Sequence, residues 1–223
     1  MSIVTNDDFE SYSAGVLHGK NGGTGWSAAW VTNDATIAVQ TSVVVSGSNA
    51  VESYNNASGS NSYRYFDELS SGIYTIYARS TTTAKAWTFL WVGDGTTSSS
   101  GRACHVLFSG TDINWQYGGS YYTLVSSYSI NTWYKVDAEF DCSTDQYRVR
   151  VDDGSWSDWE DFAVVAAATT LDISKMERQS SGPYYTYFDD ISIDDGAVPS
   201  TENISALNSI DWANVTSVNG INK

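Results

Sequence analysis

Residues 133–141 read WYKVDAEFD, a segment in which hydrophobic and polar residues alternate strictly. The even positions from Tyr134 to Phe140 are apolar, and the odd positions from Lys135 to Asp141 are charged. Successive side chains of an extended strand point to opposite faces, so this pattern is typical of a strand with one face in a core and the other in water. The segment therefore predicts a half-buried β-strand.

Runs of about strand length recur from residue 37 to residue 193, with turn residues between them. This arrangement is typical of a β-sandwich and differs from the alternating strands and helices of α/β proteins. One run, at residues 87–92, reads WTFLWV, and its alternate residues Trp87, Phe89 and Trp91 are expected to share the core-facing side. The sequence predicts an all-β fold, a two-sheet antiparallel jelly-roll sandwich with a short C-terminal docking tail.

Composition restricts the partners of the chain. With 11 Lys and Arg against 26 Asp and Glu, the formal net charge is -15. Such a charge repels phosphate backbones and anionic lipid surfaces, so nucleic acid is not expected as a partner. No stretch approaches the roughly 18 apolar residues of a membrane span, and residues 1–8 lack the basic and apolar regions of a classical export signal. We expect neither membrane insertion nor a signal peptide.

The chain divides into two parts by composition. Residues 1–196 hold the predicted sandwich, and a linker rich in Gly, Pro and Ser leads into a tail at residues 197–223. An apolar pattern repeats within the tail at a spacing of 11 residues: Ile204, Leu207, Asn208 and Ile210 recur as Val215, Val218, Asn219 and Ile221. The few apolar residues of the tail cannot form a core alone. They favour a docking element at residues 204–223 that binds a partner chain or its own domain.

Several short fragments resemble known protein families. They read DFES at residues 8–11, GWS at 25–27, TWYKV at 132–136, YRVRVDDG at 147–154 and FDDISI at 188–193. In this order and spacing they resemble the concanavalin-A-like, laminin-G and carbohydrate-binding-module jelly rolls, over roughly residues 7–195. The resemblance supports the sandwich fold and implies no single function, because these folds serve many roles.

The tail resembles the short Asn-Gly-containing repeats, with Ile, Val and Trp, at the ends of bacteriophage structural proteins. This resemblance implies a non-enzymatic virion structural protein, such as a head decoration or tail-fibre component, made in the host cytoplasm and placed on the virion surface. Its partners would be other virion subunits or further copies of itself, bound through residues 204–223, and its jelly roll would bind glycans. The alternative is a free bacterial carbohydrate-binding module or lectin that acts outside the cell.

The module resemblance also implies a structural Ca²⁺ ion where the N-terminal and C-terminal strands meet. By that resemblance the carboxylate oxygens come from four acidic residues: Asp8, Glu10, Asp189 and Asp190. Backbone carbonyls of the loop at residues 22–23 add further oxygens, and Ca²⁺ takes about six to eight of them. The alternative is that Asp8 and Asp189 simply end strands in water.

A sugar site needs aromatic rings beside hydrogen-bonding groups, because the C–H face of a sugar packs on a ring while its hydroxyl groups need donors and acceptors. The best local candidates are Trp115, Tyr117, Tyr121 and Tyr122, which lie close to amide side chains in the sequence. A second group beside loops comprises Trp156, Trp159 and Tyr184. The alternative for each ring is packing in the core or at a sheet edge.

Catalytic carboxylates are the third kind of candidate. Asp137, Glu139 and Asp141 are spaced by two along one strand, as the acid and nucleophile are in some glycoside hydrolases with related jelly rolls. The flanking residues follow the pattern of an ordinary solvent-facing strand. An endoglycanase is therefore the least favoured hypothesis, and no enzymatic activity is expected.

The cysteines and histidines are few. Cys104 and Cys142 each lie in a strand-like segment, so they either pair across neighbouring strands or stay small buried thiols, and the second interpretation is favoured. His18 and His105 lie far apart, which gives no support to a His-rich zinc site. We expect His105 to lie, with its hydrogen bonds satisfied, in or beside a strand.

Overall fold

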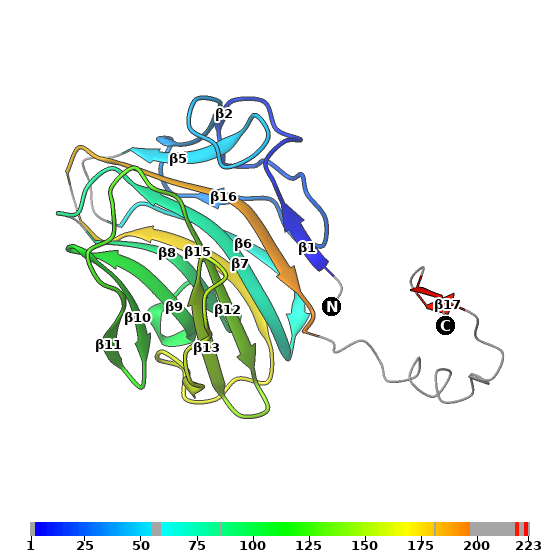
Figure 1. Cartoon of the computed structure of the whole chain (residues 1–223). Helices are drawn as coiled ribbons and strands as arrows, with labels where there is room; N and C mark the ends of the chain where they lie inside the picture. The colour runs from blue at the N-terminus through cyan, green and yellow to red at the C-terminus, as the bar shows by residue number, and fades with distance from the viewer. Residues whose placement is uncertain are drawn as a thin grey trace.

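The structure is a computed structural model. The residues that it describes are 3–54, 59–84, 86–180 and 182–196, together with the short strands at 217–218 and 221–222. Two antiparallel sheets pack face to face and enclose the core between them (Figure 1). Apart from one 3-10 turn, Ser99–Gly101, the described residues form strands and loops, and none of them belongs to a helix that could cross a membrane. The predicted all-β, two-sheet antiparallel sandwich is confirmed.

The larger sheet has nine strands. Its order is β14 (Glu160–Asp161), β13 (Gln146–Val151), β12 (Tyr134–Asp141), β7 (Ser71–Ser80), β16 (Tyr185–Asp194), β5 (Ala50–Tyr54), β4 (Ile37–Gln40) and β2 (Gly15–Val16), with β1 (Ile3–Asp7) also paired to β16. The order of the seven-stranded sheet is β11 (Ser120–Val125), β10 (Asp112–Tyr117), β9 (Arg102–Ser109), β8 (Trp87–Gly93), β15 (Leu171–Arg178), β6 (Asn61–Leu69) and β3 (Val31–Thr32). Consecutive strands β7 and β8 lie in different sheets, so the chain crosses between the layers.

The tail contributes one described feature, a pairing of β17 (Ser217–Val218) with β18 (Ile221–Asn222). The two residues between these strands are Asn-Gly, the sequence that most strongly favours a tight hairpin turn. The remainder of the predicted tail at residues 197–223 lies outside the described residues. The docking role of residues 204–223 therefore stays a prediction.

Strand β12 forms where the alternating segment predicts it. Its even residues Val136, Ala138 and Phe140 are buried between the sheets. Its charged residues face outward, where Arg148 and Arg150 of β13 lie in register with them. Burial of a large apolar side chain contributes roughly 1.5–3 kcal/mol, so the buried alternate residues set the face on which this strand packs.

Strand β8 departs from simple alternation. It pairs with β9 through a register shift between Thr88 and Leu90. A β-bulge of this kind adds one residue to one strand and reverses the faces of the side chains beyond it. Trp87 and Phe89 pack in the core cluster, whereas Trp91 is buried on the other side of the sheet, in register with a histidine of β9. The prediction that these three aromatic residues share one face is wrong.

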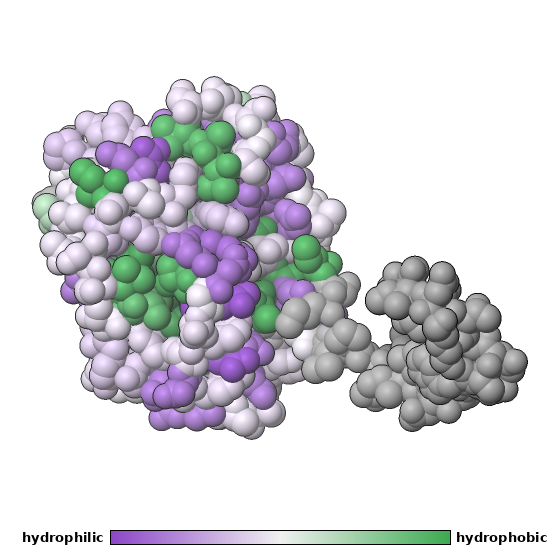
Figure 2. Space-filling model, viewed as in Figure 1, coloured by the Kyte–Doolittle hydropathy of each residue, from purple (hydrophilic) through white to green (hydrophobic). Residues whose placement is uncertain are grey.

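The molecular surface is mostly polar on the side seen in Figure 2, where hydrophobic residues form separate patches among hydrophilic ones. The exposed large hydrophobic residues are likewise scattered along the described chain, from Ile3 and Val16 to Ile130 and Val164. Scattered apolar side chains of this kind are ordinary for a protein surface.

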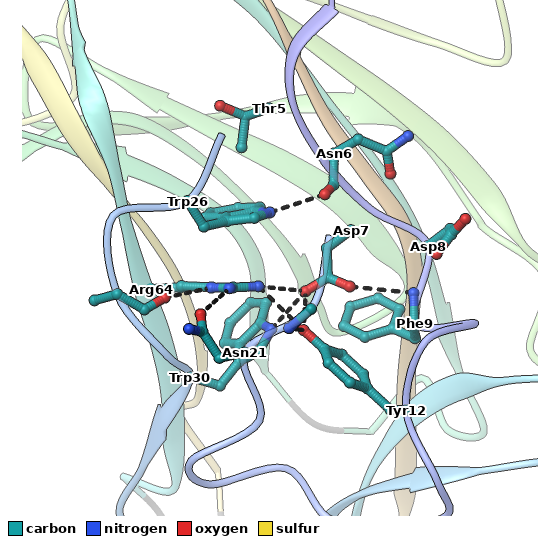
Figure 3. A network of polar contacts seen from close by, with 12 residues as sticks. Thr5, Asn6, Asp7, Asp8, Phe9, Tyr12, Asn21, Trp26, Trp30 and Arg64 are labelled. Atoms are coloured by element: carbon teal, nitrogen blue, oxygen red, sulfur yellow. Dashed lines mark hydrogen bonds and ion pairs between the residues drawn. The ribbon is translucent and has the colours of Figure 1, made fainter. Parts of the chain in front are cut away.

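A buried ion pair joins the two sheets near the N-terminus. Asp7 of β1 and Arg64 of β6 are 0% and 1% exposed, and their side chains lie 2.7 Å apart. The Asp7 oxygen that contacts Arg64 also accepts hydrogen bonds from the Tyr12 hydroxyl at 2.7 Å and the Trp30 indole at 2.8 Å. The second carboxylate oxygen of Asp7 accepts from the backbone N–H of Phe9. Figure 3 shows these side chains converging on Asp7.

The remaining donors of Arg64 are also satisfied. Its Nε donates to the carbonyl of Ala28 at 2.6 Å and its second terminal nitrogen donates to Asn21 at 2.7 Å, while the Trp26 ring lies 4.8 Å from the guanidinium carbon. Burial raises the pKa of the Asp7 carboxyl, and its hydrogen bonds and the Arg64 charge oppose that rise. A buried pair with every group satisfied serves as a structural tie between the sheets.

Candidate functional site

The outer face of the seven-stranded sheet, the side turned away from the core, carries a chain of hydrogen bonds across β8, β9 and β10. Thr88 Oγ1 lies 2.9 Å from His105 Nε2, and His105 Nδ1 lies 2.9 Å from Gln116 Oε1. At one end Gln179 donates to Thr88 at 2.8 Å, and at the other Gln116 donates to the carbonyl of Gly119 at 3.4 Å. These hydrogen bonds fix the polar side chains across three neighbouring strands of the sheet.

The protonation of His105 follows from this chain. Because Gln116 Oε1 can only accept, His105 Nδ1 carries the proton, and His105 Nε2 accepts from the Thr88 hydroxyl. Burial, followed by the nearby charge of Arg102, lowers the pKa of His105 well below its usual range. The imidazole is therefore neutral at physiological pH and acts as a rigid hydrogen-bonding link. The expectation that His105 lies satisfied in a strand is confirmed.

A hollow of about 490 Å³ lies on the same face, and its lining includes Trp91, Arg102 and Lys175. Lys175 Nζ lies 4.0 Å and Arg102 Cζ 5.4 Å from the centroid of the Trp91 ring. Lys175 Nζ also donates to the carbonyl of Thr97 at 3.0 Å and lies 2.9 Å from a carboxylate oxygen of Glu177. Two cationic side chains thus surround one indole.

Sequence reasoning missed this hollow for a specific reason. Strict alternation assigns Trp91 to the core, and only the bulges in β8 turn it outward. A second register shift, between Val92 and Gly93, accompanies the outward position of Arg102. Because Arg102 and Lys175 are far apart in the sequence, the strand order alone brings them together.

The four aromatic residues predicted to bind sugar do not share one surface. Tyr121 lies on the outer face, 49% exposed, with its ring 5.8 Å from that of His105. Tyr117 and Tyr122 stack on each other at 3.8 Å, on the side of the β10–β11 hairpin that carries Trp115. Trp115 itself is 6% exposed and packs in the core cluster. Only Tyr121 borders the outer-face hydrogen-bond chain.

The second predicted aromatic group is also divided. The guanidinium carbon of Arg148 lies 4.9 Å from the centroid of Trp156 and 4.8 Å from that of Trp159, beside β13 of the nine-stranded sheet. Tyr184 is buried, with the guanidinium carbon of Arg178 3.9 Å from its ring centroid. Tyr184 therefore does not join the two tryptophans in a common surface.

The acidic residues predicted to bind Ca²⁺ gather around the loop at residues 45–49. Glu10 accepts hydrogen bonds from two backbone N–H groups of this loop, at 2.9 and 2.8 Å. Asp189 accepts from a third N–H group at 2.9 Å, and Asp190 accepts from a serine hydroxyl of the loop at 2.9 Å. Asp8 is exposed and accepts from the backbone of Glu10 at 3.1 Å. The carboxylates thus anchor a loop.

The surroundings of this cluster disfavour the ionised form of the Asp189 carboxyl. Burial raises the pKa of Asp189 to about 7, and the nearby carboxylates of Asp190 and Glu10 add to the rise. In the part of the chain that the structure describes, no three Asp, Glu, His or Cys side chains are grouped as a metal site. As placed, the carboxylates do not form the oxygen cage that Ca²⁺ requires. The calcium site stays a prediction from the resemblance.

The three carboxylates of β12 have other partners. Asp137 lies 2.6 Å from Arg150, and Glu139 lies 2.6 Å from Arg148. Asp141 accepts hydrogen bonds within the turn that follows the strand. A retaining glycosidase needs an acid and a nucleophile facing a common substrate, whereas here two of the three carboxylates are engaged by arginine.

The cysteines are buried free thiols. Burial raises the pKa of Cys142 to about 11 and that of Cys104 well above its ordinary value. A thiol with a raised pKa is a poor nucleophile at neutral pH. The interpretation of Cys104 and Cys142 as small buried side chains is confirmed.

Comparisons with known proteins place the fold. Protein-family models and curated protein sequences give no match to this chain. A sialidase structure is similar with a TM-score of 0.63 and 10% identity, over 87% of this chain and 19% of that one. An alginate lyase variant in complex with alginate trisaccharide has a TM-score of 0.58 and 14% identity, over 86% of this chain and 99% of that one.

A third similar structure is the ligand-binding domain of botulinum neurotoxin serotype D in complex with N-acetylneuraminic acid. Its TM-score is 0.54 and its identity 14%, over 89% of this chain and 50% of that one. This chain therefore spans half or less of the sialidase and toxin chains. At these identities the likeness shows the fold, a jelly-roll-like sandwich.

Proposed function

We propose that this chain is a non-catalytic glycan-binding jelly roll whose ligand lies on the outer face of the seven-stranded sheet. The observation that carries the proposal is the hollow of about 490 Å³ on the same face as the hydrogen-bond chain through His105. A preformed concave site with a few fixed polar groups is the usual form of a small-ligand site.

Tyr121 supplies the apolar part of this recognition. Its ring is half exposed and is held edge-on by the His105 ring, at a centroid distance of 5.8 Å. The C–H face of a sugar packs on such a ring, while its hydroxyl groups bond to neighbouring polar side chains. Because these groups are already fixed by the sheet, little conformational entropy is lost on binding.

The same fold holds saccharides in other proteins. The similar alginate lyase and toxin structures contain alginate trisaccharide and N-acetylneuraminic acid, respectively. Those ligands make glycan binding a natural use of the sandwich, while the placement of the site in this chain rests on its own residues.

A glycan array followed by calorimetric titration of the best ligand tests the proposal. Tyr121→Ala is expected to weaken binding about tenfold or more, because stacking on the ring is lost. Tyr185→Ala is the matched control, since Tyr185 is 39% exposed and lies on the nine-stranded sheet. Absence of any glycan ligand, or equal losses in both variants, would contradict the proposal.

The proposal includes the absence of catalysis. Prolonged incubation with the bound glycan is expected to leave its chain length unchanged, as measured by mass spectrometry. Cleavage that disappears in Glu139→Gln would support the endoglycanase hypothesis instead.

The virion role belongs to the same proposal and is supported by the resemblance of the tail. We propose that residues 204–223 dock the glycan-binding domain on a virion subunit or on a further copy of the chain. Light scattering is expected to find an assembly for the full-length chain and a monomer for a chain that ends at Ala197. Two monomers would favour the alternative, a free bacterial carbohydrate-binding module or lectin.

A further inference from the structure

We propose that the hollow beside Trp91 binds the carboxylate of an acidic sugar, with Arg102 and Lys175 as its cationic contacts. This inference rests on the proposed function, because it names the class of glycan that the same face recognises. Uronic and sialic acid residues share the required chemistry, a planar carboxylate on a sugar ring.

The charge of the hollow contrasts with that of the chain. The formal net charge is -15, yet Arg102 and Lys175 both line this hollow. Lys175 is paired with Glu177 at 2.9 Å, whereas no carboxylate among the described residues lies within ion-pair distance of Arg102. The neutral His105 next to it adds no competing charge. Arg102 is therefore a cation held at a binding surface without an anionic partner.

Two buried donors at this place also lack acceptors. Trp91 Nε1 and Arg102 Nε are buried, and neither has a hydrogen-bond partner in the described part of the chain. Buried polar groups are nearly always satisfied, so an unpartnered pair beside one hollow requires an explanation. Both atoms have almost no accessible surface, so an acceptor oxygen of a ligand reaches Arg102 Nε only when the arginine side chain turns toward the hollow. The Trp91 ring is 2% exposed and flanked by cations, so it acts as a support for them and not as a stacking platform.

The shape of the cationic groups favours a carboxylate. A guanidinium presents parallel N–H donors that match the two oxygens of a carboxylate, and a lysine adds a point charge beside them. Lys175 is held in place by the carbonyl of Thr97 and by Glu177. Glu177 reduces the total positive charge of the hollow and offers an acceptor to a sugar hydroxyl.

The test is calorimetric titration of the full-length chain with oligogalacturonate and with the same oligosaccharide after its carboxyl groups have been reduced to alcohols. Sialyllactose against lactose forms the second pair of probes, which separates sialic from uronic acids. We expect the acidic member of at least one pair to bind about tenfold or more tightly, and added salt to weaken that binding.

Arg102→Gln is expected to remove most of the preference for the acidic member, and Arg102→Lys to retain part of it, because the charge remains while the paired donors are lost. Lys175→Gln provides a second variant should Arg102→Gln fold poorly, as judged by its thermal unfolding midpoint. Arg79→Gln is the control, since Arg79 lies on β7 of the nine-stranded sheet. It is expected to bind both probes as the wild type does.

The outcomes separate this inference from the proposed function. Equal binding of acidic and reduced sugars, unaffected by either hollow variant, would overturn the carboxylate inference and leave glycan binding intact. Binding of no saccharide at all would overturn both. Tighter binding of a sulfated sugar such as dextran sulfate, with the same dependence on Arg102, would overturn the choice of carboxylate.

Discussion

Among the arginines that lie against tryptophan rings, Arg64 and Arg102 have completely different surroundings. Arg64 lies 4.8 Å from Trp26, and each of its nitrogens has an acceptor, including the buried carboxylate of Asp7. The guanidinium carbon of Arg102 lies 5.4 Å from the centroid of the Trp91 ring. Its polar contacts are with the His105 ring, and its Nε has no hydrogen-bond partner in the described part of the chain. A closed network serves stability, whereas an incomplete network beside a hollow suits a ligand.

The largest expected effect is on stability and separates the two arginines directly. Arg64→Gln is expected to lower the free energy of unfolding by about 3–5 kcal/mol, because Asp7 stays buried without its counter-charge. Arg102→Gln is expected to change it by less than about 1 kcal/mol, because no carboxylate loses a partner. Urea denaturation of both variants measures the difference. Equal losses would show that the two regions do not differ in the way described.

Asp189 sharpens the comparison, because this buried carboxyl forms no ion pair with a cation among the described residues. Its pKa of about 7 in the folded chain lies above the ordinary value of 3.8. A raised carboxyl pKa contributes stability that is complete below about pH 4 and is lost as the pH rises through 7. The stability of Asp189→Asn relative to wild type is therefore expected to rise by on the order of 3 kcal/mol as the pH increases from 4 to 7. At every pH the variant also loses one acceptor, because both Asp189 oxygens accept backbone N–H groups and an amide has only one oxygen.

Denaturation curves at pH 4, 5.5 and 7 check this expectation. Asp153→Asn is the control, because Asp153 is exposed and Lys135 lowers the pKa of its carboxyl. Its variant should show no gain over wild type with rising pH. A constant difference between Asp189→Asn and wild type across the range would contradict the assignment of Asp189.

The calcium prediction concerns the same carboxylates. An ion bound only by the folded chain would raise the unfolding midpoint, with a gain of about 2.7 kcal/mol at a Ca²⁺ concentration 100 times its dissociation constant. If the predicted site exists, adding Ca²⁺ raises the unfolding midpoint of the wild type, and a chelator reverses this increase. Asp190→Asn is expected to abolish it. An unchanged midpoint would contradict the calcium prediction. The carboxylates would then serve only to anchor the loop at residues 45–49.

The smallest expected effect distinguishes the two sides of the β10–β11 hairpin. Tyr122→Ala removes the stack with Tyr117, which is worth about 0.5–1.5 kcal/mol beyond its buried area. Glycan affinity should stay at the wild-type value, in contrast to Tyr121→Ala, because Tyr122 lies on the opposite side of the strand. Unfolding and titration of the two variants side by side provide the check. A loss of affinity in Tyr122→Ala would place the ligand at the hairpin edge instead.

Much of the architecture follows from local pattern. The alternation from Tyr134 to Phe140 predicts strand β12 and its buried face, because every second side chain of a strand points the same way. The same rule fails at Trp91, because a bulge in β8 reverses the faces, and a bulge depends on how two strands pair. Likewise, the sequence singles out Asp8, while its neighbour Asp7 is the residue buried against Arg64.

By itself the sequence determined the all-β class, the two-sheet sandwich, the acidic surface and the position of most central strands. These properties depend on composition and on short periodic segments, which act locally along the chain. Only the tertiary structure decided that Trp91, Arg102 and Lys175 meet at one hollow, that Trp115 is buried while Tyr121 is exposed, and that Arg102 lacks a carboxylate in the described residues. Those properties depend on strand order and register, which are set by packing between segments far apart in the sequence.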